Sequence, residues 1–283
     1  MNIENYLYYI MYALVYLLLA TAMKYILNFK SSSHYSADDQ IADGNMAVGL
    51  RRSGAQLGLA IAMIGVMSGS SSPDIIKDLI NTVTYGLVAM AFMLLSLLVI
   101  DKAMLPSVDN TAELKKGNLA IGMVEFGTMV MTGLLAYASI KGDEGGVLSS
   151  LVYFIAGQIT LILLVLLYEK VLARKTNPVA CVTAGNLSAG IYLSGKIIAY
   201  GLILQSAIAG NGAGLSAADA FIEFIVAAAA GMILLYVFEI LIDLVIITST
   251  NVNDIIVKDQ TVAAVQLSVS KIGMALILGM AIL

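Results

Sequence analysis

The sequence predicts an all-α, polytopic transmembrane helical bundle with about eight spans, built as two pseudo-symmetric parallel repeats of four helices. Three observations lead to this prediction. Of the 283 residues, 60% are hydrophobic and only 12% are charged, about half the charge that a soluble domain carries. The mean hydropathy is +0.92. Long apolar stretches follow one another along the chain, and a Gly-Asn motif opens every second stretch in three of four cases.

The apolar stretches approach the roughly 20 residues that a membrane-spanning helix needs. The first stretch lacks the positively charged start of a cleaved signal peptide, so we expect it to remain as the first span. The connections between stretches are short and polar, which leaves no room for a soluble domain. The predicted spans are residues 5–28, 44–67, 79–100, 117–139, 148–169, 185–208, 218–247 and 259–283.

Basic residues predict the orientation in the membrane, because Lys and Arg are enriched in cytoplasmic connections. One set of connections carries nine basic residues, and the opposite set carries two, Lys77 and Lys141. We therefore expect both termini to lie outside the cytoplasm. The nine residues are Lys24, Lys30, Lys102, Lys115, Lys116, Lys170, Arg174, Lys175 and Lys258.

An internal repeat is the most specific feature of the chain. Each clear copy begins with Gly-Asn and has further glycines five and ten residues after the first. A degraded fourth copy, DQTVAAVQLSVSKIG, begins at residue 259. Motif starts lie 141 residues apart (185 − 44) and 142 apart (259 − 117), which divides the chain into residues 1–143 and 144–283. The motif residues are Gly44, Asn45, Gly49, Gly54, Gly117, Asn118, Gly122, Gly127, Gly185, Asn186, Gly190 and Gly195.

The motif has two interpretations. Asn is a preferred residue for capping a helix N-terminus, and Gly permits a tight turn before it. Small residues on one helix face, such as Ala47, Gly54 and Gly58, let a second membrane helix approach closely. The motif is then a rule for helix packing, and the alternative is a loop that binds a ligand. A polar residue also lies sixteen positions before each motif start; these residues are Asn28, Asp101, Glu169 and Asp243.

These helices resemble the bacterial membrane-protein family called domain of unknown function 350 (DUF350). The resemblance covers nearly the whole chain, as a duplicated form of the four-helix unit. Ser188 replaces the motif alanine in the third copy, and the fourth copy, from Asp259, has lost both Gly and Asn, which leaves its role open. The resemblance implies an integral protein of the bacterial cytoplasmic membrane. It implies no activity and no catalytic residues.

Charged residues inside the predicted spans are the candidate functional site. Each charge near the centre of a span costs roughly 2.5–3.5 kcal/mol, so these side chains should face the bundle interior and pair. We expect one buried layer, formed by Arg51, Arg52, Glu125, Lys196, Glu239, Asp243 and Lys271. Three interpretations remain open: a pathway for ions or a small solute, a static salt-bridge network, and snorkelling or contacts in an oligomer.

The sequence contains one histidine, His34, and one cysteine, Cys181. A metal site or a catalytic triad is therefore not expected. The sequence contains none of the common enzyme motifs, so we expect neither an enzyme nor a cofactor. The favoured function is a small channel or transporter for ions or a charged solute. The alternative is a non-transporting scaffold or sensor. Besides the lipid bilayer, the sequence allows a homo-oligomer and a soluble cytoplasmic partner, but a nucleic acid is not expected.

Overall fold

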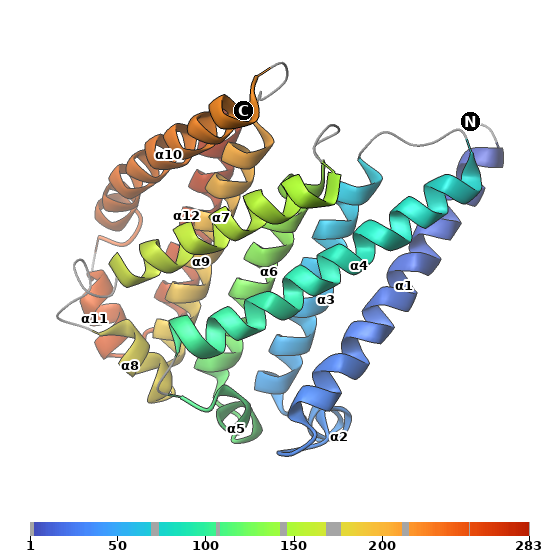
Figure 1. Cartoon of the computed structure of the whole chain (residues 1–283). Coiled ribbons are helices and arrows are strands. Elements are labelled where there is room, and N and C mark those ends of the chain that lie inside the picture. The colour runs from blue at the N-terminus through green and yellow to red at the C-terminus, as the bar shows by residue number, and fades with distance from the viewer. Residues whose placement is uncertain are drawn as a thin grey trace.

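The computed structural model describes residues 3–68, 74–105, 108–141, 146–167, 177–210, 215–248 and 250–282. Eight long helices cross the structure as four antiparallel pairs, and a short helix connects the two members of each pair (Figure 1). The first helices of the pairs are α1 (Ile3–Ser31), α4 (Ile75–Val99), α7 (Gly146–Leu167) and α10 (Ala217–Val245). The second helices are α3 (Met46–Met67), α6 (Leu119–Lys141), α9 (Leu187–Ala209) and α12 (Thr261–Ile282).

The short connecting helices lie together at one end of the bundle, and both chain termini lie at the opposite end (Figure 1). They are α2 (Ala37–Ala42), α5 (Asn110–Lys115), α8 (Pro178–Thr183) and α11 (Val252–Val257). A π-helical turn, η1 (Ile100–Met104), extends α4 at the same end. We call this the short-helix end.

Seven helices in the described part of the chain are long and apolar enough to cross a membrane. They correspond to seven of the eight predicted spans. The eighth, α3, has 22 residues but carries Arg51, Arg52 and Gln56, which lower its hydropathy. Because α3 packs side by side with α6 along its length, it belongs to the same spanning layer. The predicted all-α bundle is therefore confirmed.

The long helices form two layers. The four second helices α3, α6, α9 and α12, which we call the motif layer, stand side by side in chain order. The first helices α1, α4, α7 and α10 cross in front of them at an angle (Figure 1). α6 and α9 lie in the middle of the motif layer, and their spans are 78% and 83% buried. α12 lies at one edge of the layer, where only 33% of its span is buried.

The Gly-Asn motif ends each short helix and begins the next long one. Gly44, Gly117 and Gly185 have φ angles of +87°, +81° and +86°, a region that suits a residue without a Cβ atom. Asn45 follows as the N-cap of α3, where its side-chain oxygen accepts hydrogen bonds from the N–H groups of the first turn. The predicted capping role is confirmed.

Each motif Asn also connects its repeat to the following one. The amide nitrogen Nδ2 of Asn45 donates to the carbonyl oxygens of Leu114 (3.0 Å) and Lys115 (3.3 Å), at the end of α5. Asn186 Nδ2 likewise donates to the carbonyl oxygen of Ile256, at 2.7 Å. The last carbonyls of a helix lack partners within that helix, so the Asn side chain satisfies groups that belong to its neighbour.

The fourth copy keeps the backbone geometry of the motif although Asp259 and Gln260 replace its Gly and Asn. Asp259 occupies the glycine position with a φ of +50°, and the N–H of Gln260 bonds to the carbonyl of Ile255, as Asn45 does to Gln40 in the first copy. Gln260 stands at the position of the motif asparagine in this copy.

Small residues set the spacing within the motif layer. A methyl group placed on Gly122 would lie 2.9 Å from Cα of Ala47, and one on Gly190 would lie 2.6 Å from Cα of Ala120. Both distances are too short for a real carbon contact. The neighbouring backbones touch because these positions lack side chains, which confirms the predicted close packing.

Candidate functional site: buried charges in the two halves

Among its described residues, the first half contains one buried ion pair, Arg51 with Glu125, which we call the arginine pair. Nε of Arg51 on α3 lies 3.1 Å from Oε2 of Glu125 on α6, and the two side chains are 4% and 1% exposed. Neither carboxylate oxygen accepts a hydrogen bond from the described residues. Because a guanidinium does not lose its proton in proteins, Arg51 needs a permanent negative partner at this depth.

Arg52 does not join this pair, contrary to the prediction of a single charged layer. Its side chain leaves α3 toward the short-helix end, where its nitrogens contact Asp38 at 2.5 Å and Asn28 at 2.6 Å. Successive residues of an α-helix point about 100° apart, so adjacent arginines cannot share one direction. The hydrogen bond from Arg52, followed by that from Lys24, holds the pKa of the Asp38 carboxyl below its usual value.

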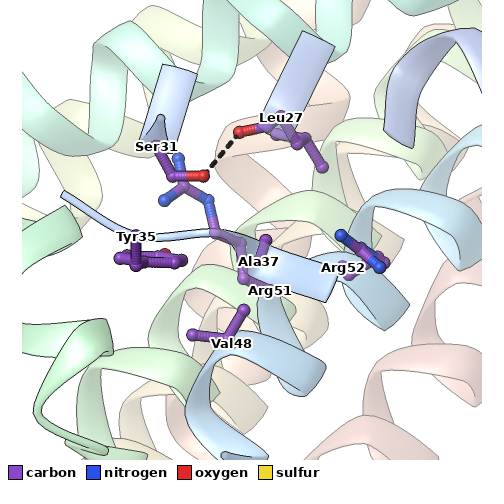
Figure 2. A pocket seen from close by; sticks show the side chains of 7 residues that line it. All are labelled: Leu27, Ser31, Tyr35, Ala37, Val48, Arg51 and Arg52. Carbon is purple, nitrogen blue, oxygen red and sulfur yellow. Dashed lines mark hydrogen bonds between the residues drawn. The ribbon is translucent and has the colours of Figure 1, made fainter. Parts of the chain in front are cut away.

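A small pocket separates the two arginines (Figure 2). Its volume is about 10 Å³, roughly the space that one water molecule needs. The Arg51 side chain reaches toward Ser31, while Arg52 lies on the other side of the pocket (Figure 2). Burial raises the pKa of Tyr35, which lines the same pocket. The first half thus offers a compact polar site with room for a single water.

The second half contains a larger group of buried charges, which we call the lysine cluster. Nζ of Lys196 on α9 lies 2.8 Å from Oε2 of Glu239 on α10, and these side chains are 3% and 5% exposed. Nζ of Lys271 on α12 lies 3.2 Å from Oδ1 of Asp243, one turn further along α10. Oε1 of Glu239 has no hydrogen-bond partner among the described residues.

Tyrosine rings complete the lysine cluster. Nζ of Lys271 donates to the hydroxyl of Tyr192 at 2.6 Å and lies 4.3 Å from the centre of its ring. Nζ of Lys196 lies 5.7 Å from the centre of the Tyr200 ring. Sequence reasoning did not find these tyrosines. Both lie on α9 within four residues of Lys196, so their helical spacing was the available signal.

The side chains of the lysine cluster differ in exposure. The side chain of Asp243 is 30% exposed, whereas that of Lys271 is 1% exposed. Lys196 lies nine residues after the start of α9 at Leu187, or about 14 Å along the helix. Asp243 lies near the end of α10, at the short-helix end of the bundle. The cluster therefore extends from that end toward the middle of the spans.

A buried polar stripe runs along α6 from the arginine pair toward the other end of the bundle. Glu125, Thr128, Thr132 and Ser139 lie on one face of this helix and are buried. Thr132 donates to Oγ of Ser96, at 2.7 Å. Oγ of Ser96 also accepts from Nε2 of Gln158, at 2.8 Å. This stripe places hydroxyl groups in the core, where the sequence analysis identified only charges.

The charges form two sites instead of one layer. Each site joins helices of a single half: α3 with α6 in the first, and α9, α10 and α12 in the second. Of the polar residues that close the first helices, Asp243 binds Lys271, and Asp101 binds Lys30 at 2.6 Å. Glu169, Lys170, Arg174 and Lys175 lie outside the described residues. The described residues also hold no group of acidic, His or Cys side chains suited to a metal ion.

The helices, the repeated motif and the buried charges define a multi-pass helical membrane protein whose four-helix unit is duplicated. The sequence profile of a family described as Domain of Unknown Function (DUF350) matches the chain twice, over residues 1–140 and 144–282. The chain therefore belongs to the DUF350 family, as the motif resemblance predicts.

A curated relative, a "UPF0719 transmembrane protein" of Aquifex aeolicus (strain VF5), is 24% identical over 137 residues. These residues are 48% of this chain and 51% of the relative, so the chain spans about half the length of the curated relative that it matches. No solved structure matches the chain.

Proposed function

We propose that this protein is a small channel or transporter for protons or small ions, and that the lysine cluster is its transfer site. The observation that carries the proposal is the combination of Lys196 and Glu239, buried at spanning depth, with the partly exposed Asp243. Ionisable groups inside a membrane protein are costly and commonly mark ion pathways. In the charged state the two lysines and two carboxylates balance, so one carboxylate can accept a proton when a lysine moves away from it.

Access and chemistry both support the lysine cluster over the arginine pair. Asp243 reaches the short-helix end, and Oε1 of Glu239 is left for a proton, an ion or a water. A lysine can release its proton in a buried site, whereas an arginine cannot. We place the short-helix end on the cytoplasmic side of a bacterial inner membrane, because its connections hold most of the basic residues. This protein would then transport without catalysing a chemical reaction.

The test is flux in proteoliposomes. Purified protein is reconstituted with a pH-sensitive dye inside the liposomes. A potassium gradient with valinomycin sets the membrane potential, and proton flux is recorded. Uptake of radioactive sodium, potassium and chloride is measured in separate liposomes without valinomycin. We expect flux for at least one ion and its loss in Glu239→Gln, to the level of empty liposomes. Glu223→Gln is the matched control, because Glu223 is an exposed carboxylate near the other end of the same helix. Absence of wild-type flux for every ion, or full flux in Glu239→Gln, would overturn the proposal.

A scaffold is the second candidate, supported by an open pocket of about 360 Å³ at the short-helix end. Lys116 and Glu113 line it together with the apolar Leu119 and Leu187, so it offers both charge and apolar surface to a soluble partner. The same flux assay separates the two functions, because a scaffold gives no flux.

A further inference from the structure

The motif layer repeats one interface three times, between α3 and α6, α6 and α9, and α9 and α12. Positions counted from each motif start describe it. We call the side of a helix that contacts the next helix of the layer its downstream face, and the side that contacts the preceding helix its upstream face. The downstream face uses positions +3, +10, +14 and +21. The upstream face uses positions +5, +9, +12, +16 and +20. Gly54 (+10) abuts Phe126 (+9), and Gly127 abuts Ser194 in the same way. The third interface repeats this contact between Gly195 and Ser268.

The interface joins two different faces, one downstream and one upstream. The first and last helices of the motif layer therefore each have one face that contacts no other helix of the layer. The upstream face of α3 has no preceding helix: Gly49 (+5) has open space around it, and Ser53 (+9) and Gln56 (+12) are exposed. The equivalent residues of α6 and α12 are covered. Gln56 lies ten residues after the start of α3, or about 15 Å along the helix, so its amide faces outward at spanning depth.

The downstream face of α12 has no following helix. Val262 (+3) and Val269 (+10) are 84% and 62% exposed, as is Met280 (+21), at 73%, and Gly273 (+14) has open space around it. In α3 the equivalent residues, such as Ala47 and Gly54, are buried against α6. The two unused faces are therefore the two complementary halves of one interface.

We propose that the downstream face of α12 in one copy of this protein packs against the upstream face of α3 in a second copy. Continuity with the three internal interfaces carries this proposal. Opposite the exposed Val262 and Val269, the α3 face presents its smallest residues, Gly49 and Ser53, which make room for the added bulk. Opposite Gly273 it presents Gln56, whose amide then leaves the lipid. A head-to-tail contact of this kind closes into a ring when its rotation permits.

The test is disulfide cross-linking in native membranes. Cys181→Ser removes the single native thiol, and Ser53→Cys and Val269→Cys place one thiol on each face. Both positions are exposed, so folding is unaffected. Oxidation should link the double variant into a series of oligomers and leave each single variant monomeric. Ser53→Cys with Ile233→Cys is the matched control, since Ile233 is an exposed residue of α10. A dimer of Ser53→Cys alone, or no more cross-linking than in this control, would overturn the proposal.

A glycine comparison separates assembly from folding. Gly49→Leu should abolish the cross-linking of the double variant and leave a folded monomer on size-exclusion chromatography, because the side chain enters open space in a single copy. Gly122→Leu occupies the equivalent position inside the layer, where the backbone of Ala47 touches it, and should prevent folding. Undiminished cross-linking in folded Gly49→Leu would contradict the proposed contact.

Discussion

The two halves descend from one repeated unit but handle buried charge differently. The first half holds one permanent cation against one carboxylate, Arg51 against Glu125, and both are nearly inaccessible. The second half holds two lysines against two carboxylates, and Asp243 reaches the short-helix end. The two sites use different positions of the repeat: Arg51 and Glu125 lie 7 and 8 residues after their motif starts (51 − 44 and 125 − 117), whereas Lys196 and Lys271 lie 11 and 12 residues after theirs (196 − 185 and 271 − 259). The comparison teaches that a duplicated unit can keep its helix packing while its buried charges arise independently in each half. Under the proposed function, the arginine pair holds α3 and α6 together and the lysine cluster is the transfer site.

The largest effect is expected at the arginine pair. Glu125→Ala leaves Arg51 as an unpaired buried cation, and removing one partner of a buried pair costs about 3–5 kcal/mol. The thermal unfolding midpoint in detergent should fall steeply. The double variant Arg51→Met with Glu125→Leu should recover most of the loss, because apolar side chains of similar size can replace a buried pair. An unchanged midpoint in Glu125→Ala would show that the pair is not structural.

Exchanging the cations sharpens the contrast between the halves. Lys196→Arg keeps the positive charge but fixes its proton, so we expect a folded protein with little flux. Arg51→Lys keeps the ion pair with Glu125, so flux should be retained. Because lysine matches the carboxylate less well than arginine does, the free energy of unfolding should fall by about 1 kcal/mol. Flux per folded protein in proteoliposomes, with unfolding midpoints alongside, measures both. Equal flux from both variants would remove the difference between the two sites.

A smaller effect is expected at the motif. Asn118→Ala removes the N-cap of α6 and the hydrogen bond from Nδ2 to the carbonyl of Thr183 in the next repeat. Loss of a cap costs about 1 kcal/mol. Gln260→Ala, at the equivalent position of the fourth copy, is the control and should cost less, because only the backbone of Gln260 makes a hydrogen bond among the described residues. The two unfolding midpoints, compared under one condition, test whether the terminal copy has lost this contact.

The smallest effect concerns pH. Arg52 and Lys24 lower the pKa of Asp38 in the folded protein, so this carboxylate stabilises the fold above its unfolded pKa of about 3.9. That stabilisation is lost as the pH falls below about 4 and through the lowered folded pKa. Because Asp38 is half exposed, we expect at most about 1 kcal/mol. The difference in midpoint between wild type and Asp38→Asn should be present at pH 6 and shrink at pH 3; a constant difference would exclude this cause.

The sequence predicted the parts of this structure that depend on local rules. Gly44 and Asn45 indicated a turn and a cap, and the small residues around Gly54 indicated a close helix contact. It also predicted that Glu125 and Lys196 are buried. The direction of Arg52 and its contact with Asp38 were not predicted, because a difference of 100° around a helix decides which neighbour a side chain meets.

Contacts between distant segments were also beyond sequence reasoning. Lys271 and Tyr192 lie 79 residues apart, and their meeting depends on how α9 and α12 pack. The hydrogen bond between the hydroxyls of Thr132 and Ser96 likewise depends on how α6 and α4 pack. The hydrogen bonds from the motif asparagines to the following repeat, such as that from Asn45 to Leu114, were not predicted for the same reason.

Replacing each buried pair by apolar residues tests the central claim most directly. Flux per folded protein is compared between Arg51→Met with Glu125→Leu and Lys196→Met with Glu239→Leu, in the same liposomes and under the same gradient. The assignment predicts that the first variant transports like wild type and that the second transports no more than empty liposomes. Retained flux in the second variant, or its loss in the first alone, would contradict the division between a structural pair and a transfer site.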